Sequence, residues 1–335
     1  MTLIKLYTKY KSTYYDAFKD LTIHSLVYMS TLYATWYYQD SCISLLTIPL
    51  LGLMNIRTFI IYHDCGHNSY TPSKELNYIV GSILGLFSFT PFCWTYEHHN
   101  HHLTVGNMEE ELDHGYNETI IYTLKEFNNM ESNKKLIYRI LRDPLFFFTI
   151  FPIIKFLLIQ RGSTLLYKYN NHPYKQSHNL ILFDTLFSNI GVYILLTNLN
   201  NYNIIYHYLL SIIIASSVGF MLFHNQHTFN PPYVVSNNKW NKTDSGLIGS
   251  SFIKIPTYLK YFTMGIEYHH IHHMNASIPG YNLQKLHNEI IQSSSEFNNI
   301  NKLSMKDCYH NLWLTLYDED TDKYISFKEA GLKIK

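Results

Sequence analysis

Hydrophobic residues along the chain gather in four long runs that form two pairs, each pair interrupted by a short polar segment. The runs cover residues 21–38 and 43–62, and then 180–197 and 204–223. A helix that spans a bilayer needs about 20 mostly apolar residues, with about 17 tolerated, so each run is long enough. The pattern therefore predicts four transmembrane helices arranged as two hairpins.

The distribution of positive charge predicts how the hairpins are oriented. Neither Lys nor Arg occurs in residues 20–56 or 176–238. Lys5, Lys9, Lys11 and Lys19 precede the first hairpin, and Arg57 lies near the end of its second helix. Lys168 and Lys175 precede the second hairpin, and Lys239 and Lys242 follow it. Because Lys and Arg concentrate in the cytoplasmic segments of membrane proteins, both polar turns should lie on the non-cytoplasmic side. Arg57 should snorkel toward the cytoplasmic side.

Two further apolar runs, 77–94 and 144–160, are not expected to cross the membrane. The first contains glycines and ends near Pro91, and the second contains Pro152 and Lys155 and has cations on both flanks. Proline interrupts a helix, and positive charge on both sides suits a segment that lies in the interface or enters and returns. The alternative interpretation of all these runs is a soluble helical protein with long core helices.

Composition narrows the classes of protein to consider. The chain has 335 residues, of which 47% are hydrophobic and 15% charged, against about 25% charged in soluble domains. This hydrophobic content excludes intrinsic disorder, and a net charge of +1 gives no support for a bulk attraction to nucleic acid. The four cysteines form no CxxC, so neither a disulfide scaffold nor a zinc knuckle is expected.

Histidine is the residue type that points to chemistry. The chain contains 19 histidines, and most lie in four short windows with the sequences HDCGH (63–67), HHNHH (98–102), HNQH (224–227) and EYHHIHH (267–273). Spacing i, i+4 puts two side chains on one helical face. On a helix, His98, His101 and His102 share a face while His99 points away, and the last window repeats this geometry with His270 as the outlier.

Clusters of this kind at the cytoplasmic ends of predicted helices indicate a metal site, because imidazole is a common metal ligand. The four windows contribute two, three, one and three inward-facing histidines in chain order, nine in all. One tetrahedral or octahedral ion binds fewer ligands than this, so we expect two ions to share them. A zinc intramembrane protease would need HExxH, which is absent. A cytochrome-b haem protein would need paired single histidines deep in the helices, and His24 and His207 lie near opposite predicted faces.

The chain resembles the membrane fatty acid desaturases, specifically the acyl-lipid branch that includes omega-6 (delta-12) enzymes. The motifs that carry the resemblance are HDCGHNS at 63–69, WTYEHHNHH at 94–102, LFHNQHTF at 222–229 and EYHHIHHMNASIPGYNL at 267–283. The resemblance covers about residues 50–290. It implies a single desaturase domain over 1–335 and an all-α fold, with hairpins at about 21–62 and 180–223. Interfacial helices and a cytosolic helical cap, about 63–179 and 224–335, would complete it.

The resemblance also implies which residues hold the metal, here a pair of iron ions cycling between Fe(II) and Fe(III). The implied ligands are His63, His67, His98, His101, His102, His227, His269, His272 and His273. Residues that would contact the ligands, or else lie at the surface, are His224, His99, His270, Asp64, Glu97, Glu109, Glu111 and Glu267. Acids of this kind fix the tautomer and orientation of a ligating histidine.

The implied reaction uses O2 and two external electrons to remove two hydrogens from the acyl chain of a membrane phospholipid. Neither an HPGG cytochrome b5 motif nor a nucleotide-binding GxGxxG occurs, so the electron donor should be separate: cytochrome b5 with its reductase, or ferredoxin. The expected location is the endoplasmic reticulum membrane in a eukaryote. Hydroxylation, an omega-3 or another desaturation on the same scaffold, and a membrane metal-binding or transport protein remain as alternatives.

Overall fold

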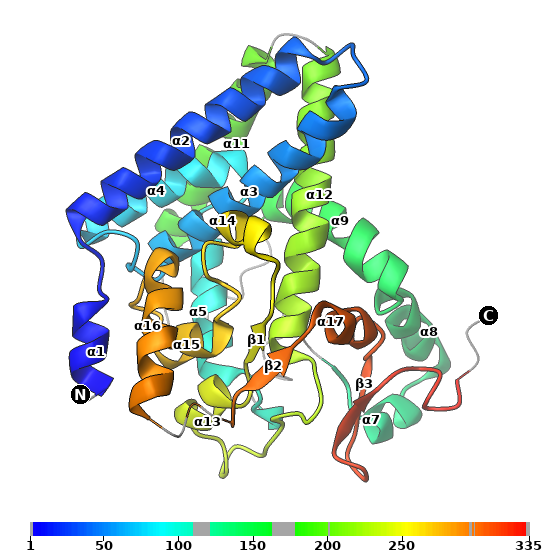
Figure 1. Ribbon diagram of the computed structural model, residues 1–335. Coiled ribbons are helices and arrows are strands. Elements are labelled where there is room, and N and C mark those ends of the chain that lie inside the picture. The colour runs from blue at the N-terminus through cyan, green and yellow to red at the C-terminus, as the bar shows by residue number, and fades with distance from the viewer. Residues whose placement is uncertain are drawn as a thin grey trace.

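The computed structural model describes residues 3–109, 121–162, 178–199, 202–294, 297 and 299–332. Four long helices form one half of the molecule: α2 (Tyr14–Tyr37), α3 (Ser44–Gly66), α11 (His178–Asn198) and α12 (Tyr202–His227) (Figure 1). At 1.5 Å per residue, the 24 residues of α2 extend about 36 Å and the 21 of α11 about 32 Å. Each predicted apolar run therefore forms a helix of membrane-spanning length.

Within the described residues, α3, α11 and α12 are both long enough and apolar enough to cross a membrane. Helix α2 has the length, but its first two turns carry Asp16, Lys19 and Asp20, and Thr, Ser and His follow. These polar residues lower the mean hydropathy of α2. Length and composition therefore support three of the four expected spans, namely α3, α11 and α12.

Shorter helices occupy the other half of the molecule and its sides (Figure 1). Their bounds are α1 (Leu3–Lys9), α4 (Lys74–Phe87), α5 (Trp94–Thr104), α7 (Leu124–Asn129), α8 (Ser132–Leu141), α9 (Phe151–Leu157), α13 (Lys242–Leu247), α14 (Lys260–Thr263), α15 (His269–Met274), α16 (Gly280–Ser293) and α17 (Met305–Asn311). The π-helix η1 (Phe146–Ile150) and the 3₁₀ helices η2 (Ile159–Gly162) and η3 (Thr257–Leu259) complete the set.

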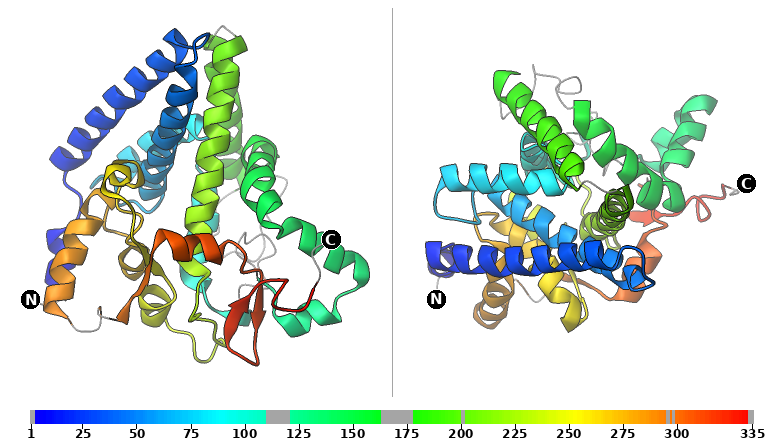
Figure 2. Two further views of the ribbon diagram at one scale, coloured as in Figure 1. Left: turned by 45° about the vertical axis from the view of Figure 1, so that its right-hand side comes forward. Right: turned by 90° about the horizontal axis from the view of Figure 1, so that it is seen from above.

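The expectation of an all-α fold is incomplete, because two small sheets are present at the end opposite the tips of the long helices (Figure 2). Strand β1 (Ser251–Ile253) pairs in parallel with β2 (Asn301–Leu303). Strand β3 (Leu316–Asp318) pairs in an antiparallel manner with β4 (Lys323–Ile325).

The two additional apolar runs behave differently from the four long ones. Run 77–94 forms α4, whose 14 residues extend about 21 Å and are too short for a bilayer core of about 30 Å. Run 144–160 forms η1, α9 and η2, and together with α8 it makes a pair of helical segments bent by 60°. Such a bend is that of a broken span or a re-entrant segment.

Helix α3 is at the centre of the packing, in contact with α2, α4 and α12. It approaches α4 closely because Gly81 has no side chain: a Cβ there would lie 2.9 Å from Cys65 Cβ and closer still to Phe92. Close packing against several neighbours buries nearly all of the second half of α3. The histidines at its C-terminal end are thereby fixed in position.

Arg57 does not snorkel to the membrane surface as predicted from sequence. Its side chain is 5% exposed and forms an ion pair with Asp20 of α2, while Tyr70 donates a 3.0 Å hydrogen bond to the same carboxylate. Arg57 also donates to the Tyr261 carbonyl and packs its guanidinium on the Tyr261 ring at 4.4 Å. A buried charge needs a partner, and a partner on a neighbouring helix is invisible in local sequence.

Candidate metal centre

Nine histidines from α3, α5, α12 and α15 converge where α3 and α12 end, and they form two groups. Cluster A consists of His63, His67, His98, His102 and His272, and cluster B of His101, His227, His269 and His273. Within each cluster one ring nitrogen of every residue lies within 4.8 Å of all the others. These are the nine residues that the sequence motifs single out, and the structure brings all of them together.

Local helix geometry explains how the residues divide between the clusters. His63 and His67 end α3 one turn apart, and both face cluster A. On α5, His98 and His102 are one turn apart and enter cluster A, whereas His101 lies about 100° from His102 and enters cluster B. On α15, His269 and His273 enter cluster B and His272 enters cluster A. Helices α5 and α15 therefore each contribute to both clusters.

The clusters are in direct contact with each other. The rings of His102 and His273 are stacked, with centroids 4.0 Å apart and planes 16° from parallel. The rings of His98 and His101 lie 5.5 Å apart. The two clusters therefore form one continuous histidine centre with two foci, which are the points where the ring nitrogens of each cluster converge.

Nitrogen atoms within each cluster are too close together to be satisfied by hydrogen bonds alone. In cluster A, His98 Nε2 lies 2.8 Å from His63 Nε2 and 3.1 Å from His102 Nε2. In cluster B, His227 Nε2 lies 3.0 Å from Nε2 of both His101 and His269. A neutral imidazole nitrogen carries either one proton or one lone pair, so a central nitrogen bonds well to only one of its two neighbours. A cation at each focus would accept all of the converging lone pairs.

Unpartnered nitrogens give independent evidence that the donor set fits a metal. The Nε2 atoms of His67 and His273 are buried and make no hydrogen bond to the part of the chain that the structure describes, although buried polar atoms are normally paired. Both belong to the clusters, one in each. An all-imidazole set suits iron, zinc, copper or nickel, so the residues present fit the metal that the resemblance implies.

Burial also keeps these imidazoles in the form that binds metal. Loss of solvent, reinforced by neighbouring imidazoles, lowers the pKa of His98 and His102 in cluster A well below the ordinary value. The same causes lower the pKa of His101, His269 and His273 in cluster B. Neutral imidazole is the ligand form, because protonation removes the lone pair.

Two clustered histidines are held by hydrogen bonds at their other nitrogen. His63 Nδ1 lies 3.2 Å from Asp64 Oδ1, and the second oxygen of this fully buried carboxylate accepts a 2.6 Å hydrogen bond from the Gly280 backbone N–H. His227 Nδ1 lies 3.1 Å from the Gly249 carbonyl oxygen. In both residues a proton on Nδ1 leaves Nε2 free to face the cluster.

The remaining singled-out histidines lie outside both clusters. His224 Nε2 is 2.9 Å from the Asn311 carbonyl oxygen, and His270 Nε2 is 3.1 Å from His287 Nδ1. His99 lies beside cluster A, with its ring 5.0 Å from that of His67. His99 and His270 belong to neither cluster, and both differ in helical phase from the clustered histidines beside them.

The acidic residues are spread more widely. Glu267 accepts a 2.8 Å hydrogen bond from Thr263 Oγ1, and Glu109 accepts one of 2.6 Å from the Asn237 backbone N–H. Glu97 lies 4.0 Å from Lys155 Nζ. Glu111 falls outside the described residues. Asp64, by contrast, contacts a clustered histidine directly, at His63 Nδ1.

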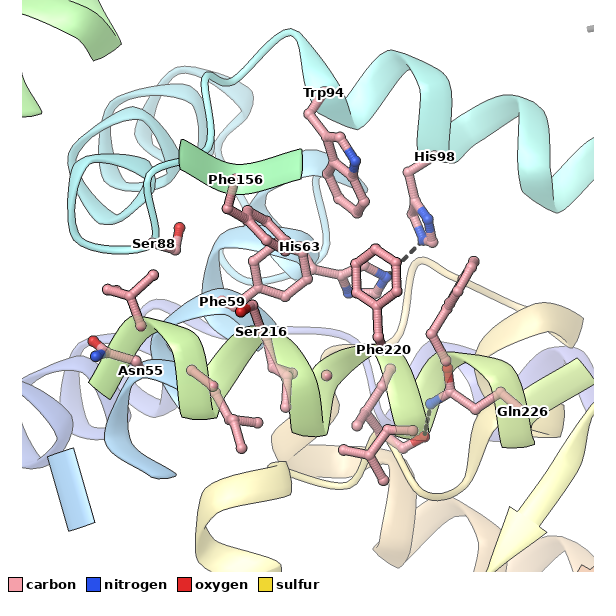
Figure 3. A pocket seen from close by; sticks show the side chains of 18 of the residues that line it. Asn55, Phe59, His63, Ser88, Trp94, His98, Phe156, Ser216, Phe220 and Gln226 are labelled. Atoms are coloured by element: carbon pink, nitrogen blue, oxygen red, sulfur yellow. Dashed lines mark hydrogen bonds between the residues drawn. The ribbon is translucent and has the colours of Figure 1, made fainter. Parts of the chain in front are cut away.

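A largely apolar cavity starts at the histidines and extends between α3 and α12 (Figure 3). His63 and His98 of cluster A lie toward one end and Asn55 and Ser88 toward the other (Figure 3), and His269 of cluster B also lines the cavity. The walls between are mainly aromatic and aliphatic, with Phe59, Trp94, Phe156, Ile212, Phe220 and Phe223. The cavity therefore connects both clusters with the interior of the long-helix half.

Sequence reasoning missed the residues that shape this cavity. Trp94 stacks on His98, with ring centroids 5.1 Å apart and planes 13° from parallel, and Phe223 packs on His101 at 5.0 Å. Aromatic residues at membrane boundaries are common for other reasons, so neither position stands out in the sequence. Helical phase relative to the histidines is the one signal that could have found them.

Comparison with known proteins assigns the family. Residues 41–299 match the family model described as fatty acid desaturase. A "Fatty acid desaturase" of Bacillus subtilis is 29% identical over 290 residues, covering 84% of this chain and 77% of that protein. An "sn-1 oleoyl-lipid 12-desaturase" of Picosynechococcus is 25% identical, covering 71% of this chain and 66% of that protein.

A second "sn-1 oleoyl-lipid 12-desaturase", from Synechocystis, is 23% identical and covers 81% of this chain and 73% of its own length. The family model spans most of the chain and includes all four histidine windows. The resemblance inferred from the histidine motifs is confirmed: the chain belongs to the fatty acid desaturase family.

Proposed function

We propose that this protein desaturates fatty acyl chains of membrane lipids, using O2 and two iron ions bound by clusters A and B. The observation that carries this proposal is the cavity: it is lined by histidines of both clusters at one end and continues as an apolar channel between α3 and α12. A hydrocarbon chain is the ligand that such a surface recognises, because burying apolar surface is favourable and needs no polar partner.

Iron would supply the oxidising chemistry, since an unactivated methylene has no acidic proton for acid–base catalysis to remove. Under this proposal, the protein itself binds and orients the acyl chain and excludes water from it. His63, His98 and His269 bring the metal-binding centre to the cavity wall. Trp94 and Phe223, packed on His98 and His101, keep the wall beside the clusters apolar. A chain in the cavity would then be held next to the centre with little freedom to move.

The double-bond position that we propose is delta-12. The support comes from relatives named as sn-1 oleoyl-lipid 12-desaturases, at 23% and 25% identity. The substrate would then be a phospholipid already carrying an oleoyl chain. Electrons would come from a separate donor, cytochrome b5 with its reductase or ferredoxin.

We also propose that α2, α3, α11 and α12 form two transmembrane hairpins with the histidine centre on the cytosolic side, in the endoplasmic reticulum membrane if the host is a eukaryote. The charge distribution around the hairpins supports this orientation. The bent segment formed by α8, η1, α9 and η2 would lie at the interface on the same side. The rest of the chain would form one cap within a single domain.

The test is expression of the full chain in a yeast that makes no polyunsaturated lipids, with analysis of the lipid fatty acids and of iron in the purified protein. We expect a new diene and about two iron ions per chain. A hydroxy fatty acid without a new double bond would overturn desaturation in favour of hydroxylation. Iron binding with no change in the lipids of any host would favour a metal-binding or transport protein instead.

A matched pair of variants links activity to the clusters. His101→Ala removes one of the four residues of cluster B, so product and part of the iron should be lost while the protein stays in the membrane. His310→Ala changes an exposed histidine of α17 and should behave as wild type. Full activity of His101→Ala would refute the role of cluster B.

A further inference from the structure

Gly52 of α3 and Gly219 of α12 lie on the helices that border the cavity, and they differ in what surrounds them. A Cβ at Gly52 of α3 would lie 2.9 Å from Ile214 Cγ2 and 3.2 Å from the Ser211 carbonyl oxygen. A Cβ at Gly219 of α12 would meet no atom of the described residues within 4 Å outside its own stretch of helix. Packing of α3 against α12 therefore explains the glycine at 52 but leaves the glycine at 219 unexplained.

Backbone conformation does not explain Gly219 either. The residue lies in the middle of the α-helix Tyr202–His227 and is not among the glycines with positive φ. Glycine weakens a helix interior relative to alanine, because it fixes more backbone freedom on folding. Glycine at this position lowers helix stability, and a larger residue could replace it without a clash. The reason for a glycine here must therefore be the space that it leaves open.

That space is the cavity. Gly219 is one of the residues that line it, and it lies on the same helical face as Phe223, one turn later, and His227, two turns later. At 1.5 Å per residue it is about 12 Å along the helix from His227 and about 10 Å from Ile212, which also lines the cavity. Gly219 thus lies partway between the histidine centre and the far end.

At the far end, the lining residue Asn55 belongs to a network of satisfied hydrogen bonds. Asn55 accepts a 2.9 Å bond from Tyr28 Oη and donates one of 2.9 Å to Ser211 Oγ. Tyr208 Oη lies 3.2 Å from Tyr28 Oη and donates a 2.8 Å bond to the Phe87 carbonyl. All four side chains are buried. Because their polar atoms already have partners, this network offers a fixed wall and not a polar binding site.

We propose that Gly219 determines specificity: it leaves the room through which the methyl-terminal part of an acyl chain extends past the histidine centre toward the Asn55 network. This inference rests on the proposed function, since it takes an acyl chain as the occupant of the cavity. A side chain at position 219 would shorten the accessible cavity from the far end, and the bound chain would stop earlier.

The size of the effect follows from the burial of methylenes. Each methylene excluded from an apolar site lowers affinity roughly fourfold, so exclusion of about two lowers it about 15-fold. Chains short enough to end before Gly219 should keep their affinity. The expected signature of Gly219→Leu is therefore an altered preference between long and short chains, with Gly219→Ala showing a smaller change in the same direction.

Ser217 provides the matched control. It lies two residues earlier on α12, about 200° around the helix, and does not line the cavity. Ser217→Leu adds a leucine to the same helix outside the cavity. A general effect of leucine on folding or membrane insertion would appear in both variants.

The experiment measures binding and product separately on the purified full chain. Displacement of a fluorescent fatty acid by phospholipids of increasing acyl length gives the preference for long over short chains. It needs no catalysis, so it decides the role of Gly219 even if no desaturation is found. In cells, a shorter cavity should move the new double bond toward the methyl end, because a chain that stops earlier presents a carbon nearer its terminus.

A reduction of about tenfold or more in the long-to-short preference of Gly219→Leu, with Ser217→Leu unchanged, would support the proposal. An unchanged preference in Gly219→Leu would overturn it, and so would an equal loss of affinity for chains of every length. Absence of product from the wild type, with the chain-length effect intact, would count against desaturation and leave the role of Gly219 standing.

Discussion

Asp64 offers a sharp test of how the histidine centre is held together. Its carboxylate is fully buried and uses both oxygens, one beside His63 Nδ1 at 3.2 Å and one accepting from the Gly280 N–H at 2.6 Å. Asp64→Asn preserves the shape of the side chain but replaces one acceptor oxygen with an NH₂ donor. We therefore expect it to fail at one of these two contacts.

Either orientation of the new amide has a defined consequence. If the NH₂ group faces Gly280, two donors oppose each other, and the unpaired buried N–H costs about 1–3 kcal/mol. If it faces His63, it favours a lone pair on Nδ1 and moves the proton to Nε2, the nitrogen that faces cluster A. Loss of such a contact to a metal-binding histidine typically lowers metal affinity about 10–100-fold, equivalent to about 1.4–2.8 kcal/mol.

The assay is iron titration into the metal-free full chain against a competing chelator, together with thermal unfolding in detergent. Asp320→Asn, at a side chain 76% exposed, removes the same charge at the surface together with an exposed ion pair to Lys125, and should change stability by less than about 1 kcal/mol. Iron affinity and unfolding temperature of Asp64→Asn equal to those of Asp320→Asn would refute the role assigned to Asp64.

Three more predictions concern the Arg57 ion pair, the protonation of the histidines and the orientation of the chain. Arg57→Ala should destabilise the protein by up to about 3–5 kcal/mol, because it removes the cationic partner of the Asp20 carboxylate, which is only 17% exposed; a change in unfolding free energy below about 1 kcal/mol would contradict a stabilising role of this ion pair. The metal-free protein should lose stability as pH falls below about 6.5: burial lowers the pKa of the clustered histidines in the folded state, so the unfolded chain takes up more protons there. A flat unfolding midpoint from neutral pH to about 5 would count against this. Finally, the sequons that begin at Asn241 and Asn275 should remain unglycosylated in a eukaryotic host, and a glycan on either, detected by a glycosidase-sensitive mobility shift, would reverse the proposed orientation.

The sequence predicts most of the helical framework, because long apolar runs and helical phase are local properties. It places the four long helices within a few residues, apart from the start of α2. That helix begins at Tyr14, well before residue 21, because the Thr13 side chain accepts a hydrogen bond from Asp16 and caps a polar first turn. Polarity of the first two turns hides them from a search for apolar residues.

Features that depend on distant partners escape prediction. The pairing of β1 with β2 joins residues such as Ser251 and Asn301, and strands of three residues have no recognisable pattern of their own. The burial of Arg57 depends on Asp20 in another helix. Likewise, helical phase gives the inward-facing histidines, but their division into two clusters depends on where α5 and α15 lie relative to α3 and α12.

The sharing of α5 and α15 between both clusters has a consequence for how the protein is assembled during synthesis. The segments that meet at the histidine centre end with His273, more than 200 residues after His63. Neither cluster is complete until α15 has left the ribosome, because α15 supplies one residue to cluster A and two to cluster B. We therefore expect the long helices to form first and any metal to bind last, to a nearly complete chain. Chains truncated before α15 should be recognised as unfinished by the quality-control machinery of the cell.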